Sequence, residues 1–231
     1  MRTLPPNSTL ANMVFRVLLC NWLIAAFTFG AVAETKIKPV RIVVFGDSLA
    51  AGFQLKASDA FPAQLERALK AKGYPVEVIN AGVSGDTTAA GLERLQWSVP
   101  ERTDAVILEL GANDALRGLD PTRARANLDR IIATIKTGGA EVLLAGMIAP
   151  RNLGANYTRT FNGMYAELAQ KHGLILYPFF LEGVALNGDL NLSDGVHPNP
   201  KGVAEIITRI LPKVEELIAR VRARQPAGPK G

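Results

Sequence analysis

Two kinds of hydrophobic pattern alternate along the chain from residue 38 onward. Runs of consecutive apolar residues, such as Ile42-Val43-Val44, are typical of strands that are buried on both faces of a sheet. Apolar residues spaced three and four positions apart, as at Phe61, Leu65 and Leu69, indicate helices that bury one face. The strands predicted in this way are 38–45, 76–81, 105–110, 141–145 and 174–180. The predicted helices are 61–72, a segment that ends near 99, 121–136, about 157–171 and 203–221.

Proline and glycine separate these elements, as at Pro75, Pro100 and Gly173. Pro212 falls inside the last helix and predicts a kink or a split there. Successive strand–helix units predict an α/β fold with a single domain, in which one five-stranded parallel sheet lies between two layers of helices. No internal repeat, linker or second domain is evident, and residues 223–231 are expected to form a flexible tail.

The first 33 residues contain no Asp or Glu and have the features of a secretory signal peptide. Arg2 and Arg16 precede an apolar run that continues to Val32, and Ala31-Val32-Ala33 offers a cleavage point after Ala33. Translation from Met13 would give a signal of more ordinary length. The alternative is an uncleaved membrane anchor, but the run is shorter than the roughly 20 residues that span a bilayer. We therefore expect a periplasmic or secreted bacterial protein whose domain covers residues 34–222.

Composition narrows the possible functions. A single cysteine, Cys20, excludes an internal disulfide and a cysteine-based zinc cluster, and Leu19 before it does not match a lipoprotein signal. Two histidines, His172 and His197, exclude a multi-histidine metal site. The net charge is +5, and no block of five or more like charges is present, so the sequence carries no nucleic-acid footprint.

The candidate chemistry lies where the predicted strands end, because ligands of open α/β sheets bind beyond the carboxyl ends of the strands. Gly46-Asp47-Ser48 follows the first strand and exposes the Ser48 hydroxyl on a turn, although this triplet alone is ordinary turn chemistry. Ser84 is a second candidate nucleophile. Its surroundings, Gly82-Val-Ser-Gly-Asp86, approach the Gly-x-Ser-x-Gly elbow but have Asp86 in place of the last glycine.

Two further loops supply hydrogen-bond donors at the same edge of the sheet. Gly85 follows the second strand and Asn113 follows the third, in Gly111-Ala-Asn-Asp114. Both segments are also compatible with simple turns or helix caps. The backbone N–H of Gly85 and the side-chain amide of Asn113 are nevertheless placed to converge near Ser48.

An acid and a base follow the fifth strand. Asp194 and His197 are three residues apart, so the carboxylate can reach one imidazole nitrogen while the other nitrogen faces Ser48. His172 is the competing histidine, and we interpret it as structural because it lies in the last turn of a predicted helix. Nucleophile, base, orienting acid and oxyanion donors are thus all available from loops at one edge.

These segments resemble the SGNH (GDSL-type) hydrolase family, and within it the bacterial arylesterase, acyl-CoA thioesterase I and lysophospholipase group. The resemblance covers roughly residues 40–222 and matches Ser48, Gly85, Asn113 and the Asp194/His197 pair in order. It implies a flavodoxin-like sheet of strand order 2-1-3-4-5, with Ser48 and Asn113 beside the point where the strand order reverses.

The resemblance also implies a mechanism. Ser48 would attack an acyl carbonyl, His197 would accept its proton and Asp194 would orient the imidazole. The N–H groups of Ser48 and Gly85 and the amide of Asn113 would hold the oxyanion. No metal or cofactor is required. The expected partner is a small-molecule acyl ester or thioester; we expect no nucleic acid partner, no stable membrane anchor after signal cleavage, and a monomer.

The resemblance further implies an acyl-chain groove lined by residues after the third and fourth strands, for which the candidates are Leu116, Arg117, Ile148, Pro150, Leu153 and Tyr157. The alternative is ordinary packing for the apolar residues and a solvated surface for Arg117. A carbohydrate O-deacetylase on the same fold is the competing activity, and few aromatic residues besides Trp97 offer a stacking surface for sugars. A third possibility, a non-catalytic binding protein of the same shape, would not require the four signature residues to coexist.

Overall fold

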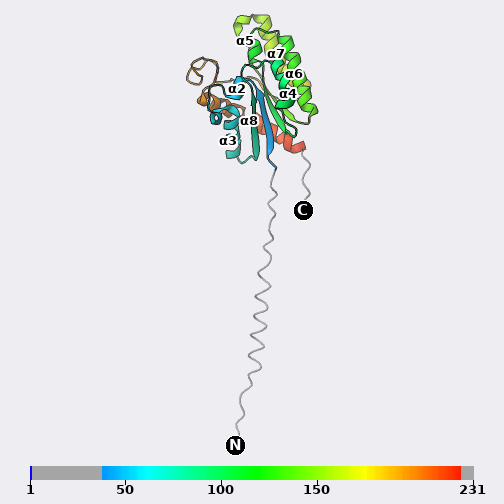
Figure 1. Ribbon diagram of the computed structural model, residues 1–231, viewed down its shortest axis with the longest axis vertical. Coiled ribbons are helices and arrows are strands. Elements are labelled where there is room, and N and C mark those ends of the chain that lie inside the picture. The colour runs from blue at the N-terminus through cyan, green and yellow to red at the C-terminus, as the bar shows by residue number, and fades with distance from the viewer. Residues whose placement is uncertain (2–37, 225–231) are drawn as a thin grey trace. The chain divides into compact units, whose positions relative to one another are not determined.

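The computed structural model describes Met1 and residues 38–224, in which strands and helices alternate (Figure 1). The strands are β1 (Val40–Gly46), β2 (Val76–Gly82), β3 (Ala105–Glu109), β4 (Glu141–Ala145) and β5 (Ile175–Tyr177). The α-helices are α2 (Ser48–Ala51), α3 (Phe61–Ala71), α4 (Thr88–Ser98), α5 (Ala112–Leu116), α6 (Pro121–Thr137), α7 (Ala155–His172) and α8 (Pro200–Arg224). Two 3-10 turns, η1 (Ala57–Asp59) and η2 (Arg151–Leu153), complete the described elements.

All five strands are parallel and lie in the order β2-β1-β3-β4-β5. The predicted three-layer α/β/α class, the single domain and the strand order are therefore confirmed. Helices α4, α6 and α7 cover one face of the sheet, and α3 and α8 cover the other (Figure 1). β3 is buried at all of its positions, as its uninterrupted apolar run predicts for a central strand.

The site is positioned by β1 and β3, because the strand order reverses between them. β1 pairs with β2 on one side and with β3 on the other, and Gly46 at its carboxyl end lies opposite both Gly82 and Glu109. The segments that leave these three strands consequently start side by side at one edge of the sheet.

Several element ends differ from the prediction. β5 stops at Tyr177 instead of continuing to residue 180, because Pro178 has no N–H for the ladder. α8 continues through Pro212 as one helix, so the expected split does not occur; its buried apolar face, which includes Ile210 and Val214, packs on both sides of the proline. The short helices α2 and α5 were not predicted, since four or five residues are too few to show a period.

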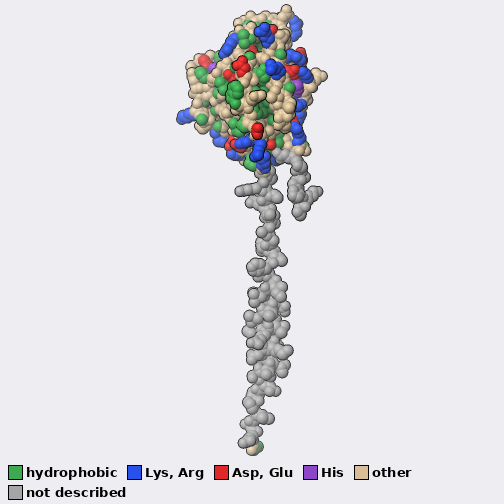
Figure 2. Space-filling view, turned by 45° about the vertical axis from the view of Figure 1, so that its right-hand side comes forward, with side chains coloured by type: hydrophobic (Ala, Val, Ile, Leu, Met, Phe, Trp, Pro, Cys, Tyr) green, Lys and Arg blue, Asp and Glu red, His purple; other side chains and the backbone are tan. Residues whose placement is uncertain are grey.

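The terminal predictions fall largely outside the described residues. The signal peptide, residues 1–33, and most of the tail lie there, and α8 extends to Arg224, two residues beyond the predicted end of the domain. Within residues 38–224, no helix is both long and apolar enough to cross a membrane. On the face shown in Figure 2, Lys and Arg side chains stand around the margin and hydrophobic side chains are scattered over the middle.

Candidate active site

Ser48 is the first residue of α2, immediately beyond the end of β1. Asp47 caps this short helix, and its Oδ1 accepts a hydrogen bond of 3.0 Å from the N–H of Leu49. The turn is tight: a Cβ atom at Gly46 would lie 2.4 Å from Oε2 of Glu109, so only glycine fits there. Ser48 itself remains partly exposed, whereas its neighbours Asp47 and Leu49 are buried.

His197 approaches this turn from the far side, on the segment between β5 and α8. Its Nε2 lies 2.9 Å from Oγ of Ser48, although the two residues are 149 positions apart in the sequence. Its Nδ1 lies 2.7 Å from Oδ2 of Asp194. An ionised carboxylate can only accept, so Nδ1 carries the proton and Nε2 accepts from the Ser48 hydroxyl. The ring of Phe53 packs against the imidazole, with 4.4 Å between the ring centroids.

Asp194 is held in its ionised form by its own loop. Its Oδ1 accepts from the backbone N–H groups of His197, at 3.0 Å, and Val196, at 2.9 Å. These two bonds, together with the bond from the His197 ring, lower the pKa of Asp194 from 3.8 to about 2. The carboxylate is therefore negative throughout the neutral range and favours the Nδ1-protonated imidazole.

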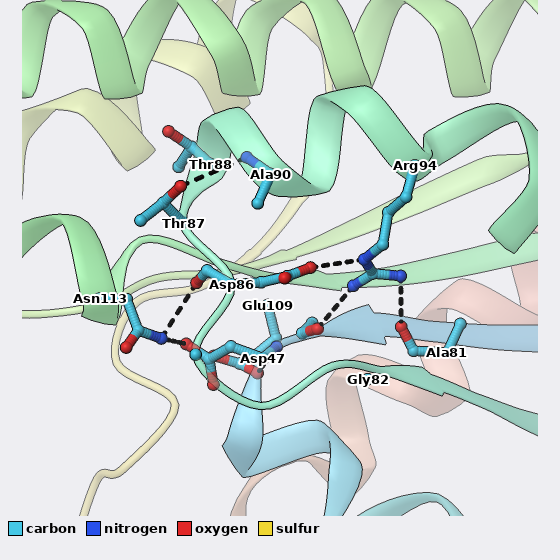
Figure 3. Close-up of polar contacts among 12 residues, drawn as sticks. Asp47, Ala81, Gly82, Asp86, Thr87, Thr88, Ala90, Arg94, Glu109 and Asn113 are labelled. Carbon is cyan, nitrogen blue, oxygen red and sulfur yellow. Dashed lines mark hydrogen bonds and ion pairs between the residues drawn. The ribbon is translucent and has the colours of Figure 1, made fainter.

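Asn113 lies in α5, and its side-chain nitrogen is directed into the cluster of loops at the sheet edge (Figure 3). Nδ2 donates to Oδ2 of Asp47 and to the backbone oxygen of Asp86, each at 3.0 Å. Gly85 lies in the loop between β2 and α4 and has a φ of 86°. Its carbonyl accepts a hydrogen bond of 2.7 Å from the Arg117 side chain. The structure thus brings Ser48, Asn113 and His197 together, with Asp194 behind the imidazole.

A cavity of about 280 Å³ opens beside Ser48. Its lining comes from five segments of the chain, which lie within residues 47–49, 112–116, 147–150, 179–186 and 195–197. Leu116, Ile148 and Pro150, three of the predicted groove residues, are among them. The lining is mostly apolar apart from the polar groups of Asp47, Ser48, Asn113 and His197.

The other predicted groove residues lie elsewhere. Arg117 contacts the Gly85 carbonyl, and Leu153 packs partly buried against the core. The Tyr157 hydroxyl donates to the carbonyl of Leu119 at 2.8 Å, so it fastens the connection between α5 and α6. None of the three is part of the cavity lining. Sequence reasoning in turn missed Phe179, Leu181, Ala185 and Leu186, whose irregular connection gives no periodic signal.

A buried polar network beneath the turn was also missed. Asp47 and Glu109 are both 0% exposed, and Oε2 of Glu109 accepts from the Asp47 N–H at 3.2 Å. Burial, followed by the negative charge of Asp47, raises the pKa of Glu109 well above its ordinary value of 4.5. Burial also raises the pKa of Asp47, to about 6. The one available signal was an acidic residue, Glu109, within the apolar run 105–110.

His172 is engaged outside this site. Its Nε2 lies 2.5 Å from Oδ1 of Asp129 on α6, which also pairs with Lys171. This contact supports the structural interpretation of His172. In the part of the chain that the structure describes, no group of three or more His, Cys, Asp or Glu side chains is arranged to hold a metal ion.

Comparison with known proteins identifies the family. The model of the GDSL-like lipase/acylhydrolase family matches residues 44–205. The chain is 38% identical over 195 residues to an arylesterase of Vibrio mimicus, covering 83% of this chain and 96% of that protein. It is 37% identical over 189 residues to thioesterase 1/protease 1/lysophospholipase L1 of Escherichia coli strain K12, covering 81% and 87%.

A solved structure leads to the same conclusion. The esterase AlinE4, described as a member of the SGNH-hydrolase family, is 46% identical and superposes with a TM-score of 0.66, covering 78% of this chain and 97% of that one. The match to the family model spans more than half of the chain and includes Ser48, Gly85, Asn113, Asp194 and His197. The chain therefore belongs to the GDSL-like lipase/acylhydrolase family, the SGNH hydrolases.

Proposed function

We propose that this chain is a serine hydrolase that cleaves carboxylic esters or thioesters of acyl chains. The observation that carries the proposal is the continuous line of contacts from Asp194 through His197 to Oγ of Ser48, at the mouth of an apolar cavity. Relatives named arylesterase and thioesterase support the reaction class.

Ser48 is the nucleophile in this proposal. Its Oγ attacks the acyl carbonyl carbon while Nε2 of His197 takes the hydroxyl proton, and the carbonyl oxygen becomes an oxyanion. Collapse of the tetrahedral intermediate breaks the bond to the leaving group, which departs with the proton from His197. Water then attacks the acyl-enzyme, with His197 again as the base, and releases the carboxylic acid and free Ser48. Asp194 stabilises the imidazolium in both steps.

The oxyanion is stabilised by the backbone N–H groups of Ser48 and Gly85 and by the side-chain amide of Asn113. Preorganised donors of this kind are each worth roughly 10²–10³ in kcat. Asn113 lines the cavity together with Ser48, which supports this role.

The acyl group occupies the apolar cavity. Leu116, Ile148, Leu186 and Val196 contribute to its lining and remain between 44% and 97% exposed, which extends the apolar surface to the rim. An alkyl chain is bound better by such a surface than a sugar is. Trp97 lies on α4 and is not part of the cavity, which disfavours the carbohydrate O-deacetylase alternative.

We further propose that the enzyme is a monomer exported to the periplasm or the exterior, with residues 1–33 removed after Ala33. The charge and hydropathy of those residues support export. In that compartment, acyl esters of exogenous or envelope origin are more accessible substrates than cytoplasmic thioesters.

The proposal is tested with the protein beginning at Glu34. Its hydrolysis of three kinds of substrate is compared: p-nitrophenyl esters of graded chain length, an acyl-CoA and an acetylated sugar. We expect turnover of the esters, and we expect Ser48→Ala to abolish it while thermal unfolding stays unchanged. Preference for the acetylated sugar over all acyl esters would favour the deacetylase. Turnover retained by Ser48→Ala would reject Ser48 as the nucleophile.

A further inference from the structure

The backbone N–H of Ser48 is free, whereas the N–H groups on either side of it are bound. The Asp47 N–H donates to Oε2 of Glu109 at 3.2 Å, and the Leu49 N–H donates to Oδ1 of Asp47 at 3.0 Å. No oxygen of residues 38–224 accepts from the Ser48 N–H. Backbone N–H groups in folded proteins almost always have an acceptor. Of these three consecutive groups, only that of Ser48, which lines the cavity, is left for a ligand.

Glu109 supplies one of the two acceptors from the neighbouring strand (Figure 3). It is the last residue of β3 and lies opposite Gly46 at the end of β1. Gly46 has no side chain, and a Cβ atom there would lie 2.4 Å from Oε2 of Glu109, so the carboxyl occupies that room. The carboxyl therefore packs directly against the backbone from which the Ser48 turn starts.

The peptide group between Gly46 and Asp47 is held on both of its sides. Its N–H is bound by Glu109, and its carbonyl oxygen accepts from the Val83 N–H at 3.0 Å and from a terminal nitrogen of Arg94 at 2.8 Å. Hydrogen bonds that are shielded from water are stronger than exposed ones. This peptide group cannot rotate without breaking one of them, so the chain enters the turn in one orientation.

Stability alone does not account for a carboxyl at position 109. Glu109 is 0% exposed, and its Oε1 is buried without a hydrogen-bond partner among the described residues. Burying a polar atom without a partner costs free energy, which an apolar side chain of similar size would avoid. Burial, followed by the charge of Asp47, raises the pKa of Glu109 well above its ordinary value. Near pH 7 the group is a neutral acceptor, which places no negative charge of its own beneath an oxyanion.

We propose that Glu109 and Asp47 are positioning residues for the oxyanion donor on Ser48. Glu109 binds the N–H before it and Asp47 binds the N–H after it, so the Ser48 N–H is free and fixed in place before the substrate arrives. Stabilisation of a developing charge requires such preorganised donors. Neither carboxyl transfers a proton or forms a covalent bond with the substrate. This inference rests on the proposed function of the same site.

Paired substitutions of Glu109 test the proposal. Glu109→Met removes the acceptor oxygens but keeps an unbranched side chain of similar length, whereas Glu109→Gln keeps an oxygen that can accept. We expect Glu109→Met to lower kcat for a short p-nitrophenyl ester by about 10–100-fold, with a much smaller change in KM, as misplacement of a group that acts in the transition state does. Glu109→Gln should keep kcat within about two-fold of that of the unmodified enzyme.

Inhibition by a short alkylboronic acid reports on the oxyanion donor itself. Such a compound forms a tetrahedral, anionic adduct with a reactive serine and so resembles the transition state, which the enzyme binds more tightly than the substrate. In Glu109→Met, its inhibition constant should rise by about the same factor by which kcat/KM falls. In Glu109→Gln, the inhibition constant should stay within about two-fold.

A second pair of variants tests the other side of the turn and does not depend on the folding of the Glu109 variants. Asp47→Ser and Asp47→Ala both lose the bond from Asn113, so that loss cancels when the two are compared. Serine at this position can still accept from the Leu49 N–H, as capping residues do, and alanine cannot. We expect kcat to be about 10-fold higher in Asp47→Ser than in Asp47→Ala.

Asp104→Ala is the matched control. It also removes a carboxylate that accepts a backbone N–H, that of Arg41 at 2.8 Å, but Asp104 precedes β3 at the opposite end of the sheet. Its kcat should equal that of the unmodified enzyme. Thermal unfolding of every variant, with assays well below each unfolding temperature, separates positioning from folding.

Four results would overturn the proposal: an unchanged kcat in Glu109→Met, an equal fall in Glu109→Met and Glu109→Gln, equal kcat in Asp47→Ser and Asp47→Ala, or a fall in kcat that only follows the folded fraction. The proposed function fails by a different result, namely turnover that is retained by Ser48→Ala.

Discussion

The two halves of the candidate active site are held by different means. The turn that carries Ser48 is an extension of the sheet: Asp47 and Glu109 beneath it are completely buried, and its polar contacts reach β3, α4 and α5. The segment that carries His197 is exposed, with the Asp194 side chain 37% accessible. Long-range contacts therefore fix the nucleophile, whereas the base depends on its own loop.

The His197 loop is stabilised by local hydrogen bonds. The Leu192 N–H donates to the carbonyl of His197 at 2.7 Å, and an isolated bridge joins Asn191 to Pro198. Asn199 closes the loop: its Nδ2 donates to the carbonyls of Asp189 and Asn191, and its Oδ1 accepts from the first turn of α8. Segments with few buried contacts open at lower free energy than sheet-built ones. The base should therefore be the more easily displaced half.

The largest effect is expected where the two halves meet. Replacing His197 by alanine removes the only ring that contacts Oγ of Ser48 among the described residues. We expect kcat to fall by roughly 10⁴-fold or more, as removal of a triad base does in serine hydrolases. Thermal unfolding should be nearly unchanged, because the imidazole lies at the surface of the fold. His172→Ala is the control, and it should retain activity; the opposite ranking would reassign the base.

A smaller effect is expected from loosening the loop without touching the chemistry. Asn199→Ala removes two loop-closing bonds and the cap of α8, a loss of roughly 0.5–2 kcal/mol for the cap alone. We expect kcat to fall by about an order of magnitude, beyond the effect of the lower unfolding temperature, since misplacement by about 1 Å can cost that much.

The matched control for the loop is Asn156→Ala, which removes a side chain of the same type from the start of α7, where it contacts Arg159. Assays well below the unfolding temperature of each variant isolate the catalytic effect. If Asn199→Ala and Asn156→Ala retain equal kcat, the loop does not depend on its internal bonds.

On the buried side, Glu109→Gln should have little effect. A neutral carboxyl and an amide have the same shape, and each offers one acceptor and at least one donor, so the bond from the Asp47 N–H survives. Near pH 7, we expect kcat to stay within about a factor of two of that of the unmodified enzyme. The unfolding temperature should change by no more than a few degrees. A fall in kcat of about 100-fold would mean that Glu109 acts as an ion.

The smallest effect concerns stability against pH. The pKa of Asp194 is lowered to about 2 in the folded state, from an ordinary value of 3.8. Its contribution to the free energy of unfolding is therefore present above about pH 4 and lost as the pH falls through 2. The difference in unfolding temperature between the unmodified enzyme and Asp194→Asn should be constant from pH 7 to 5. Below pH 4 this difference should shrink towards zero.

The raised pKa of Asp47 acts in the opposite direction, since a carboxyl that is protonated more readily in the folded state adds stability as the pH falls below 6. It is present in both proteins, so it cancels in the difference. A gap that widened in acid would contradict the assignment of the lowered pKa to Asp194.

The sequence was sufficient to predict the fold and the meeting of the site residues because both follow from position along strands. Apolar runs identify the five parallel strands, and Ser48 and Asn113 come directly after two strands that pair with each other. His197 required more, since its place depends on an irregular segment. The short spacing from Asp194 and the family resemblance supplied that link.

The supporting contacts were not predictable in the same way. Arg94 lies in a helix whose pattern gives no reason to bury a charge, and its three acceptors come from two strand ends and a loop. The cavity wall at Phe179 and Leu186 lies in a connection without a period. Such contacts are decided by three-dimensional packing, which local spacing does not record.

The measurement that bears most directly on the central claim is mapping of the covalent adduct formed with an alkyl fluorophosphonate, a reagent that reacts with activated serines. Intact-mass and peptide analysis of the folded enzyme should show one equivalent of adduct, located on Ser48, and Ser48→Ala should take up none. His197→Ala should react far more slowly, because the hydroxyl has lost its base. An adduct on Ser84, or no adduct in an enzyme that hydrolyses esters, would contradict the assignment of Ser48 as the nucleophile.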